Sequence, residues 1–353
     1  MKAVFLTEPG ELELNDIPAP ACGNGMVKVR IESVGVCDDD INAYRGLTEY
    51  QRYPIVLGRD AAGVVVETGE ATSNGDPRII TFRRAAADPG ARVVLLPHRI
   101  PRDHDLSVCS ERCRYDRMGR LGFNVDGALR EFAVLPVEQV AVLPDGVSMK
   151  EAVFVQSVCK ALNAVQSAAP EEDDTVAIMG AGDIGIIAAQ IVLAHSARPV
   201  LIDPAQSRLE LARAMGVTHV VNPFASYAAE EIEWITSGDM ADSVIDTAGD
   251  PAGMGSCLQF AGSGGRVVFT RKPAEKTIAD LRYIVDRDLS VHSCGNTSCD
   301  VDAAMRLLVD RTVKVDSLVS ATLPMEAAPL IIPSVARNPG HYMRVVLSNG
   351  SGS

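Results

Sequence analysis

The chain has 353 residues, of which 47% are hydrophobic and 22% charged, and its formal net charge is -13. This length suggests about two domains, and this composition is typical of a globular protein rather than a disordered one. The negative charge, without a long run of lysine or arginine, argues against nucleic acid and anionic membranes as partners and is compatible with a cationic substrate.

The N-terminal stretch MKAVFLTEPGELEL has no apolar segment behind a basic start. No stretch reaches the roughly 18–20 apolar residues of a transmembrane helix. We therefore expect a cytoplasmic protein. The cysteines, at positions 22, 37, 109, 113, 159, 257, 294 and 299, are scattered over the chain, so we expect free thiols rather than a disulfide framework.

Short apolar runs broken by glycine and proline fill the first 150 residues. They are MVKVRIESVGV, AAGVVVETGE, ARVVLLP, EFAVLP and VAVLPDG. Runs rich in β-branched residues at this spacing predict an all-β unit with long surface loops. The stretch at 71–90 is interpreted as a surface excursion.

After residue 151, strand-like and helix-like segments alternate. They are DTVAIMG, DIGIIAAQIVLAHS, RPVLID, SRLELARAMG, HVVNP, DSVIDTAG and GRVVFT. Such alternation predicts βαβ units and a parallel sheet. The segment DLSVHSC at 288–294 could be an edge strand, which either pairs with a second copy of the chain or is covered within one chain.

A glycine pattern, Gly180-x-Gly182-x-x-Gly185, lies between a predicted strand and a predicted helix. The first glycine permits a tight turn, the second lets a pyrophosphate approach the backbone, and the third lets helix pack on strand. About 20 residues downstream, the next strand ends in Asp203, whose carboxylate can bind the ribose hydroxyls of NAD and would repel the extra phosphate of NADP. Arg208 could stack on adenine or counter that phosphate, but is more simply interpreted as a solvated residue of a helix.

Several motifs resemble those of the medium-chain dehydrogenase/reductase family, and within it the zinc-dependent alcohol and polyol dehydrogenases. GVCDDDINAYRG resembles the family's GxCGTDxHxxxG stretch, VLGRDAAGVVVETGE its GHExxGxVxxVG stretch, and NVDGALREFAVLP its DGGFAEYxxxP stretch. EAVFVQSVCKALNAV looks like the helix at the domain boundary, and VIDTAGDPAGMGSCLQFAGSGGRVVF resembles a segment of the cofactor domain. The resemblance covers essentially the whole chain.

The resemblance implies an α/β fold in three parts. These are a GroES-like β-rich catalytic domain at 1–152, a Rossmann doubly wound parallel sheet that binds NAD at 153–296, and a C-terminal return to the catalytic domain at 297–348. It also implies hydride transfer between a nicotinamide and a carbon bearing oxygen, a small polar substrate, and a homo-oligomer, either a dimer or a tetramer. It adds Asp183, Ile184 and Thr247 to the candidate cofactor-binding residues.

The candidate active site departs from the family pattern at the metal ligands. Zinc-dependent members hold the metal with a cysteine, the histidine of GHE, and a glutamate or cysteine on the boundary helix. Here Cys37 remains, but Arg59 and Gln156 occupy the other two positions. Arginine keeps its proton, cannot donate a lone pair, and opposes the charge of Zn²⁺, so we expect no catalytic metal. Cys37 is then a buried remnant rather than a nucleophile.

The family's second, structural zinc uses four closely spaced cysteines, whereas this chain has only Cys109 and Cys113 in that region. His98 and His104 could complete a tetrahedral set. Alternatively, all of these are surface residues of a long lobe.

Without zinc, the reaction needs a base. Zinc lowers the pKa of a bound hydroxyl from about 15.7 to about 7, worth about 12 kcal/mol, whereas a protein cation about 4 Å away supplies about 4 kcal/mol. A positioned base must therefore take the proton as hydride leaves. Lys160 is one candidate, because it lies four residues after Gln156 in an apolar strip where desolvation would lower its pKa. Its head could instead reach solvent.

Asp39 is the other candidate base, since it replaces the serine or threonine that starts the family's proton relay. Arg59 and Asp60 could pair with the nearby acids and fill the metal pocket with an ion network. Asp38 and Asp40 could form a solvated turn and a loop cap. These acids could also bind an ammonium group on the substrate.

The sequence thus predicts an NAD-dependent dehydrogenase that oxidises a secondary alcohol of a sugar, polyol, amino sugar or aminocyclitol without zinc. Two alternatives remain open. One is a zinc-free quinone or enoyl reductase of the same family, and the other is a catalytically silent NAD-binding protein.

Overall fold

The computed structural model describes residues 1–70, 88–99, 119–273, 275–294 and 300–349. The chain folds into two compact units, here called unit 1 (Met1–Val155 and Val319–Ser353) and unit 2 (Gln156–Leu318). The sequence predicts that the chain passes from the first domain to the second between residues 152 and 153 and returns between residues 296 and 297. Among the described residues, no helix is both long and apolar enough to cross a membrane.

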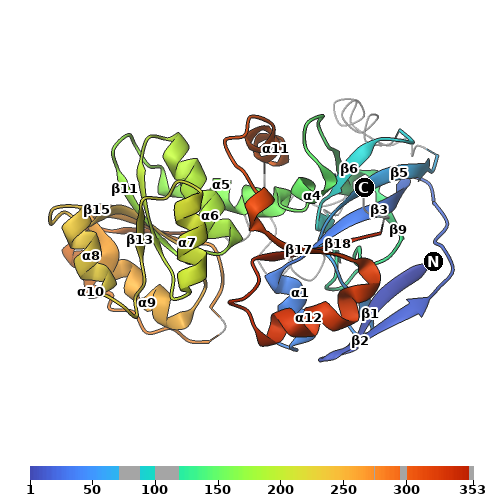
Figure 1. The fold of residues 1–353 in the computed structure, drawn as a ribbon, viewed down its shortest axis with the longest axis horizontal. Helices are drawn as coiled ribbons and strands as arrows, with labels where there is room; N and C mark the ends of the chain where they lie inside the picture. Colours follow the sequence, from blue (N-terminus) through green and yellow to red (C-terminus); the bar gives the residue numbers. More distant parts are fainter. Residues whose placement is uncertain (71–87, 100–118, 274, 295–299, 350–353) are drawn as a thin grey trace. The chain divides into compact units, whose positions relative to one another are not determined.

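Unit 1 is built mainly from β-strands (Figure 1). Its strands are β1 (Lys2–Glu8), β2 (Glu11–Asp16), β3 (Met26–Val36), β4 (Ile55–Val56), β5 (Asp60–Thr68), β6 (Arg92–Leu95), β7 (His98–Arg99), β8 (Gly119–Arg120), β9 (Phe132–Pro136), β10 (Val140–Val142), β17 (Val319–Pro324) and β18 (Arg344–Ser348). In the described ranges they form a main sheet of order β10-β6-β5-β3-β18-β17, with β9 also paired to β3, and smaller sheets β2-β1-β4 and β7-β8.

The central strand of this unit, β3, shows why the site residues lie where they do. Its first half alternates between buried and partly exposed residues, whereas its last four residues are all buried. The strand is paired on both sides along its length, with β5 and β9 in its first half and with β5 and β18 in its second half. Gly35, near the end of β3, faces Asp60 across one pair of strands and Val346 across the other. The chain therefore reaches Cys37 at the centre of the main sheet.

The helices of unit 1 are short and lie beside the sheets. They are α1 (Asp38–Tyr44), α4 (Met149–Ala152) and α12 (Ala328–Arg337), with 3-10 turns at Val137–Gln139 and Met325–Ala327. Helix α4 begins with a capping box, because Ser148 N donates to Glu151 Oε2 at 2.7 Å and Glu151 N donates to Ser148 Oγ at 3.2 Å.

Unit 2 alternates strands and helices, as the sequence predicts. Its strands are β11 (Thr175–Met179), β12 (Arg198–Ile202), β13 (His219–Val221), β14 (Ala241–Asp246), β15 (Ala261–Phe269) and β16 (Ser290–Ser293). Its helices are α5 (Val155–Ala168, which begins at the last residue of unit 1), α6 (Asp183–Ala194), α7 (Gln206–Ala214), α8 (Ala228–Ile235), α9 (Pro251–Phe260), α10 (Arg282–Asp286) and α11 (Val301–Val309), with a 3-10 turn at Asp316–Leu318.

The strands of unit 2 form a parallel sheet in the order β13-β12-β11-β14-β15-β16. The order reverses at β11, so right-handed crossovers place α6 and α7 on one face and α9 on the other. Figure 1 shows α6 and α7 together and α8 to α10 grouped apart from them. The central strands are almost wholly buried, as expected for a sheet covered on both faces. The predicted doubly wound sheet is therefore confirmed.

Strand β16 lies at the edge of this sheet. All four of its residues are exposed, and in the described part of the chain it pairs only with β15. The predicted edge strand is confirmed.

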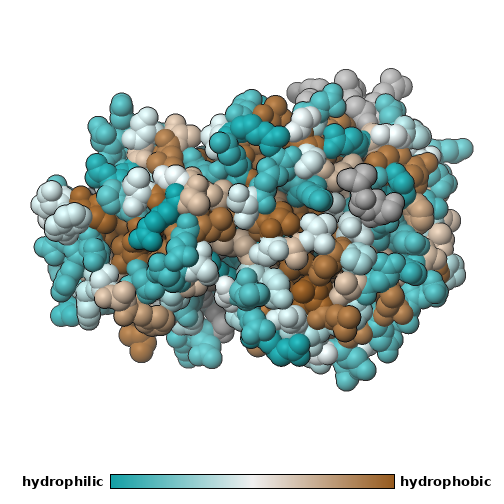
Figure 2. Space-filling model, in the orientation of Figure 1, coloured by the Kyte–Doolittle hydropathy of each residue, from teal (hydrophilic) through white to brown (hydrophobic). Residues whose placement is uncertain are grey.

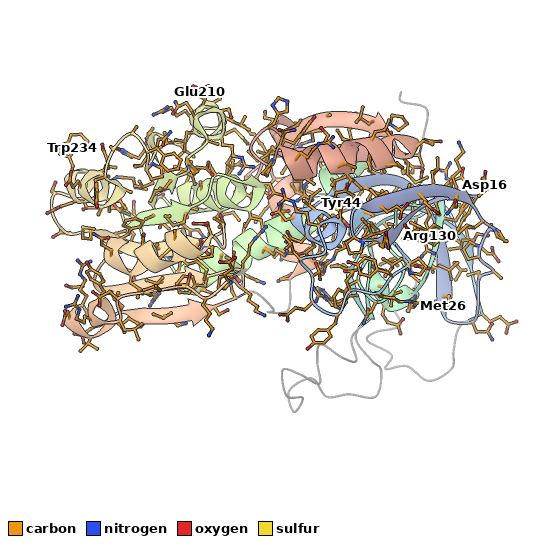
Figure 3. All side chains as sticks on the ribbon, turned by 90° about the horizontal axis from the view of Figure 1, so that it is seen from below. Asp16, Met26, Tyr44, Arg130, Glu210 and Trp234 are labelled. Carbon is orange, nitrogen blue, oxygen red and sulfur yellow. The ribbon has the colours of Figure 1, made fainter. Side chains whose placement is uncertain are left out.

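The face of the molecule drawn in Figure 2 is mostly hydrophilic, with apolar residues interspersed. In Figure 3, Trp234 on α8 and Glu210 on α7 point outward, and Trp234 is 78% exposed.

Candidate active site

The glycine turn after β11 has the geometry of a dinucleotide site. Gly180 has a φ of +97°, and a Cβ on Gly185 would lie 1.8 Å from the Gly180 carbonyl oxygen. These two positions therefore require glycine. A Cβ on Gly182, by contrast, would have no atom within 4 Å, and Gly182 caps α6 without a side-chain hydrogen bond. The turn thus leaves open space at a helix N-terminus, which fits a pyrophosphate group.

Thr247 fastens the end of β14 to this turn. Its amide and its Oγ1 both donate to the Met179 carbonyl at 2.9 Å, and Oγ1 is also 3.1 Å from the Gly180 carbonyl. Ile184 is buried in α6. Both predicted residues therefore lie at the turn. These hydrogen bonds give Thr247 a role in shaping the glycine turn.

Asp203 lies where the sequence predicts the ribose-binding carboxylate. It follows β12, is only 5% exposed, and accepts hydrogen bonds from Ala181 N at 2.8 Å and Ala205 N at 2.7 Å. Arg208 is not simply solvated, because its Nη1 lies 3.8 Å from Asp203 Oδ2 and its side chain is 25% exposed. One turn of α7 is enough to bring Arg208 back to the strand end, so the expectation of a solvated arginine is wrong.

Helix α5 contacts the glycine turn through a residue that sequence reasoning missed. Ser157 Oγ donates to Asp183 Oδ2 at 2.9 Å, and Ile184 N donates to Asp183 Oδ1 at 2.8 Å. Ser157 is 3% exposed. The only signal for this contact in the sequence is a small polar residue inside an apolar helix.

The structure does not support a desolvated lysine at position 160. Gln156 is half-buried and Lys160 is exposed, although Val158, Cys159 and Ala161 are buried. Neighbours in sequence lie about 100° apart around a helix, so an apolar stretch of sequence does not surround a side chain in space.

The expectation of free thiols is wrong at Cys159, which is disulfide-bonded. In the described part of the chain, the free cysteines are at positions 22, 37, 257 and 294.

In unit 1, the turn after β3 is organised by Asp40. Cys37 is the N-cap of α1, and both its amide and its Sγ donate to Asp40 Oδ2, at 3.1 and 3.2 Å. Gly58 N donates to Asp40 Oδ1 at 2.9 Å. Asp40 is 2% exposed, whereas Asp38 is exposed. The interpretation of Asp40 as a cap is therefore confirmed.

The surroundings of Cys37 disfavour ionisation of its thiol. Burial raises the pKa of Cys37 well above its usual value, and the charges of Asp40, Asp60 and Asp39 raise it further, while Arg59 acts in the opposite direction. Burial also raises the pKa of Asp40, partly offset by the amides of Cys37 and Gly58. A metal ligand or a nucleophile requires the thiolate. The Cys37 Sγ here donates a hydrogen bond to Asp40 Oδ2.

Arg59 pairs with Asp39, as the sequence suggests. The Arg59 guanidinium is 9% exposed and forms an ion pair with the Asp39 carboxylate, which is 44% exposed. Burial alone lowers the pKa of Arg59, but the charges of Asp39 and its neighbours outweigh this and raise it. This ion pair places a permanent cation beside an accessible carboxylate.

Asp60 has a partner that the sequence did not predict. Arg344 Nη1 on β18 lies 2.7 Å from Asp60 Oδ2, and both side chains are almost fully buried. The Arg344 guanidinium also stacks over the Phe154 ring at 5.2 Å. Arg59 and Asp60, adjacent in sequence, thus form ion pairs with different partners, Asp39 and Arg344. The available signal was an arginine at the start of the apolar strand RVVLS.

A second buried acid was also missed. Asp246 ends β14, is fully buried, and accepts the Gly249 amide at 3.1 Å. Burial raises its pKa to about 6, against the opposing effect of the Gly249 and Ala248 amides and of Arg271. Asp246 therefore shapes the loop that carries Thr247 against the glycine turn.

The residues at the family's catalytic metal positions do not fit a zinc ion. Arg59 has no lone pair and pairs with Asp39, Gln156 carries a neutral amide, and the Cys37 Sγ is hydrogen-bonded to Asp40. Within the ranges that the structure describes, no group of three or more His, Cys, Asp or Glu side chains is arranged to hold a metal. Of the second zinc candidates, His98 is exposed in β7, and Cys109, Cys113 and His104 lie outside the described residues.

A doubly wound sheet with this glycine turn and an acid after the second strand, joined to a β-rich unit, defines a two-domain dehydrogenase. Family models agree. The alcohol dehydrogenase GroES-like domain matches residues 23–145, and the zinc-binding dehydrogenase domain matches residues 184–310. The chain belongs to the medium-chain dehydrogenase/reductase family and is an alcohol dehydrogenase-like oxidoreductase, which confirms the predicted α/β, GroES-like and Rossmann architecture.

Similar proteins cover more than nine-tenths of the chain. An uncharacterised zinc-type alcohol dehydrogenase-like protein of Haemophilus influenzae is 26% identical over 98% of both chains. Sorbitol dehydrogenase of Bacillus subtilis is 25% identical over 92% of this chain and 91% of its own. The crystal structure of 2R,3R-butanediol dehydrogenase from Bacillus subtilis superposes with a TM-score of 0.86 at 21% identity, covering 99% of each chain.

Proposed function

We propose that this protein is an NAD-dependent dehydrogenase that oxidises a secondary alcohol of a small polar substrate to a ketone without a catalytic zinc ion. The substrate class is a sugar, polyol, amino sugar or aminocyclitol. One observation carries the zinc-free part of the proposal: Arg59 stands at a metal-ligand position and forms an ion pair with Asp39. The similarity to a sorbitol dehydrogenase supports a polyol-like substrate.

The cofactor part of the proposal rests on unit 2. When bound, the nicotinamide of NAD accepts a hydride from the alcohol carbon. The open side of Gly182 and the N-terminus of α6 would hold the pyrophosphate. The Asp203 carboxylate would accept the ribose hydroxyls, and its negative charge at the same point disfavours NADP. Arg208 beside it reduces this repulsion, so we expect a preference for NAD rather than complete exclusion of NADP.

The proton of the substrate hydroxyl needs an acceptor in unit 1. Asp39 is accessible, and its partner Arg59 carries a positive charge that can stabilise negative charge on the substrate oxygen. A cation about 4 Å away supplies about 4 kcal/mol at an effective dielectric near 20, too little to hold a full alkoxide. Asp39 therefore accepts the proton as the hydride leaves. Lys160, exposed on α5, is the second candidate for this role.

Two further ion and hydrogen-bond contacts have supporting roles. Asp40 fixes the turn that carries Asp39, through its bonds to Cys37 and Gly58. The Asp60–Arg344 pair fixes the first residue of β5, directly after Arg59. Neither pair needs to touch the substrate for the site to keep its shape.

We also propose that the protein is a cytoplasmic homo-oligomer. The exposed edge of β16 can continue the sheet of unit 2 by pairing with β16 of a second copy. Val291, in the middle of β16, is 44% exposed. Val291→Pro would remove a backbone donor from this edge. Light scattering should then report monomers for the variant, whereas an unchanged assembly would exclude this interface.

A substrate panel tests the proposal. The purified protein is assayed with NAD⁺ and NADP⁺ against polyols, amino sugars and aminocyclitols, and with NADH and NADPH against quinones and enones. We expect NAD⁺ reduction by one of the polar alcohols, unaffected by a chelator. Turnover of quinones or enones with NADPH would favour the reductase alternative. Cofactor binding without any turnover would favour a catalytically silent protein.

A further inference from the structure

Asp183 lies at the point where the glycine turn becomes helix α6. It is the first residue of the helix, directly after the open position Gly182. The first amides of an α-helix have no partner within the helix, and they are the groups that bind phosphate in dinucleotide sites. In this chain one of these amides already has a hydrogen-bond acceptor, because Ile184 N donates to Asp183 Oδ1 at 2.8 Å.

The second oxygen of the same carboxylate is held from outside the turn. Ser157 Oγ, on α5, donates to Asp183 Oδ2 at 2.9 Å. Ser157 is 3% exposed, so this bond is sheltered from water. The carboxylate is therefore bound between the helix amide on one side and α5 on the other. A negative charge at a helix N-terminus is favourable for the fold. It is unfavourable for a second anion at the same amides.

We propose that the Asp183 carboxylate competes with the pyrophosphate of the cofactor for the N-terminus of α6, and so weakens cofactor binding. This inference rests on the proposed function, because it takes the glycine turn as the cofactor site. When the pyrophosphate takes the Ile184 amide, the bond to Ser157 retains the carboxylate on the α5 side. Asp183 is thus an affinity-setting residue, and Ser157 is the residue that positions it.

The test is NADH binding to the full-length protein, followed by the fluorescence of the bound nicotinamide. Asp183→Asn removes the charge but keeps an oxygen that can accept from Ser157. We expect the Kd of NADH to fall about fivefold or more, the size of a partly screened contact between charges. The matched control is Glu172→Gln, an exposed residue before the amino end of β11, which makes the same change in net charge and should leave the Kd unchanged.

Salt distinguishes an electrostatic role from a structural one. At about 1 M ionic strength the screening length is about 3 Å, so the difference between wild type and Asp183→Asn should shrink. Ser157→Ala should weaken NADH binding in the wild-type background and have no further effect in the Asp183→Asn background. Thermal unfolding of each variant verifies that it is folded.

The outcomes separate this inference from the proposed function. If wild type and Asp183→Asn bind NADH with equal affinity, or if the difference persists in high salt, the competition does not exist. If neither form binds NADH, the proposed function is wrong and the inference with it.

Discussion

The glycine turn of unit 2 and the Cys37 turn of unit 1 keep their backbone course by different means. In the glycine turn, the essential feature is the absence of side chains, since a Cβ on Gly185 would lie 1.8 Å from a backbone oxygen. In the Cys37 turn, the backbone course is kept by a capping box between Cys37 and Asp40, while the side chains that define the chemistry have changed. Fold and chemistry are therefore encoded by different residues, even within one short turn.

Two buried arginines of unit 1, Arg59 and Arg344, show how the fold accommodates a buried positive charge. A buried arginine is costly unless a carboxylate pairs with it. Arg59 has Asp39 and Arg344 has Asp60, so each buried cation has its own partner.

The largest effect is expected from Asp39→Asn. Loss of a general base costs about 10²- to 10⁴-fold in kcat. The Kd of NADH should not change, because cofactor contacts are assigned to unit 2. Steady-state kinetics with the best alcohol of the panel, and NADH titration, measure the two quantities. Asp38→Asn, an exposed neighbour, is the control and should keep wild-type turnover. Full activity of Asp39→Asn, with loss of activity in Lys160→Met, would transfer the role to the lysine.

A pair of glycine variants tests the cofactor turn. Gly185→Ala should destabilise the protein by about 3 kcal/mol or more, because the new methyl group overlaps backbone that cannot move away. Gly182→Ala should unfold at nearly the wild-type temperature, since its methyl group meets no protein atom, but should bind NADH weakly. Calorimetry and NADH titration together report both properties. Equal unfolding temperatures for the two variants would contradict the packing argument.

Breaking the buried Asp60–Arg344 pair should destabilise the fold by about 3–5 kcal/mol, because Arg344→Met leaves an unpaired buried carboxylate. The matched control is Arg30→Met, which removes an ion pair with Glu32 whose side chains are 52% and 33% exposed. Surface pairs of that kind contribute about 1 kcal/mol or less. Urea unfolding measures the loss of stability in the two variants. A small effect of Arg344→Met would mean that Asp60 finds another partner.

Replacement of Asp246 should change the free energy of unfolding by about 3 kcal/mol at most, and the change should depend on pH. Its pKa in the folded protein is about 6, against about 4 in an unfolded chain, and each unit is worth 1.36 kcal/mol. A raised pKa means that stability is present below pH 4 and is lost as the pH rises through 6. Asp246→Asn should therefore stabilise the protein above pH 7 and have no effect below pH 4, as measured by urea unfolding across this range.

The charged and titratable groups around Asp246 are Arg271, Asp250 and Cys257. The control is Asp280→Asn, since hydrogen bonds from Arg282 lower the pKa of Asp280 to about 2 and the sign of any effect is reversed. A pH-independent effect of Asp246→Asn would contradict the assignment.

The sequence predicts features that depend on local spacing and misses those that depend on distant contacts. The glycine turn, Asp203 and the arginine at position 59 all follow from short motifs. Arg344 could not be assigned to Asp60, because 284 residues separate them and only the pairing of β18 with β3 brings them together. The expected desolvation of Lys160 was wrong, and its alternative, a head that reaches solvent, was right, because residues that are neighbours in sequence do not surround a side chain on a helix. Asp183 was recognised as a cofactor residue, but its contact with Ser157 requires the packing of α5 on the turn.

Zinc analysis of wild type and Cys37→Ala tests the claim that ion pairs take the place of a catalytic zinc ion in unit 1. Any zinc held elsewhere in the chain is common to both proteins. We predict the same zinc content in both, and unchanged turnover of the wild type after chelation. A loss of about one zinc ion per chain in Cys37→Ala, with chelation abolishing wild-type turnover, would contradict the claim.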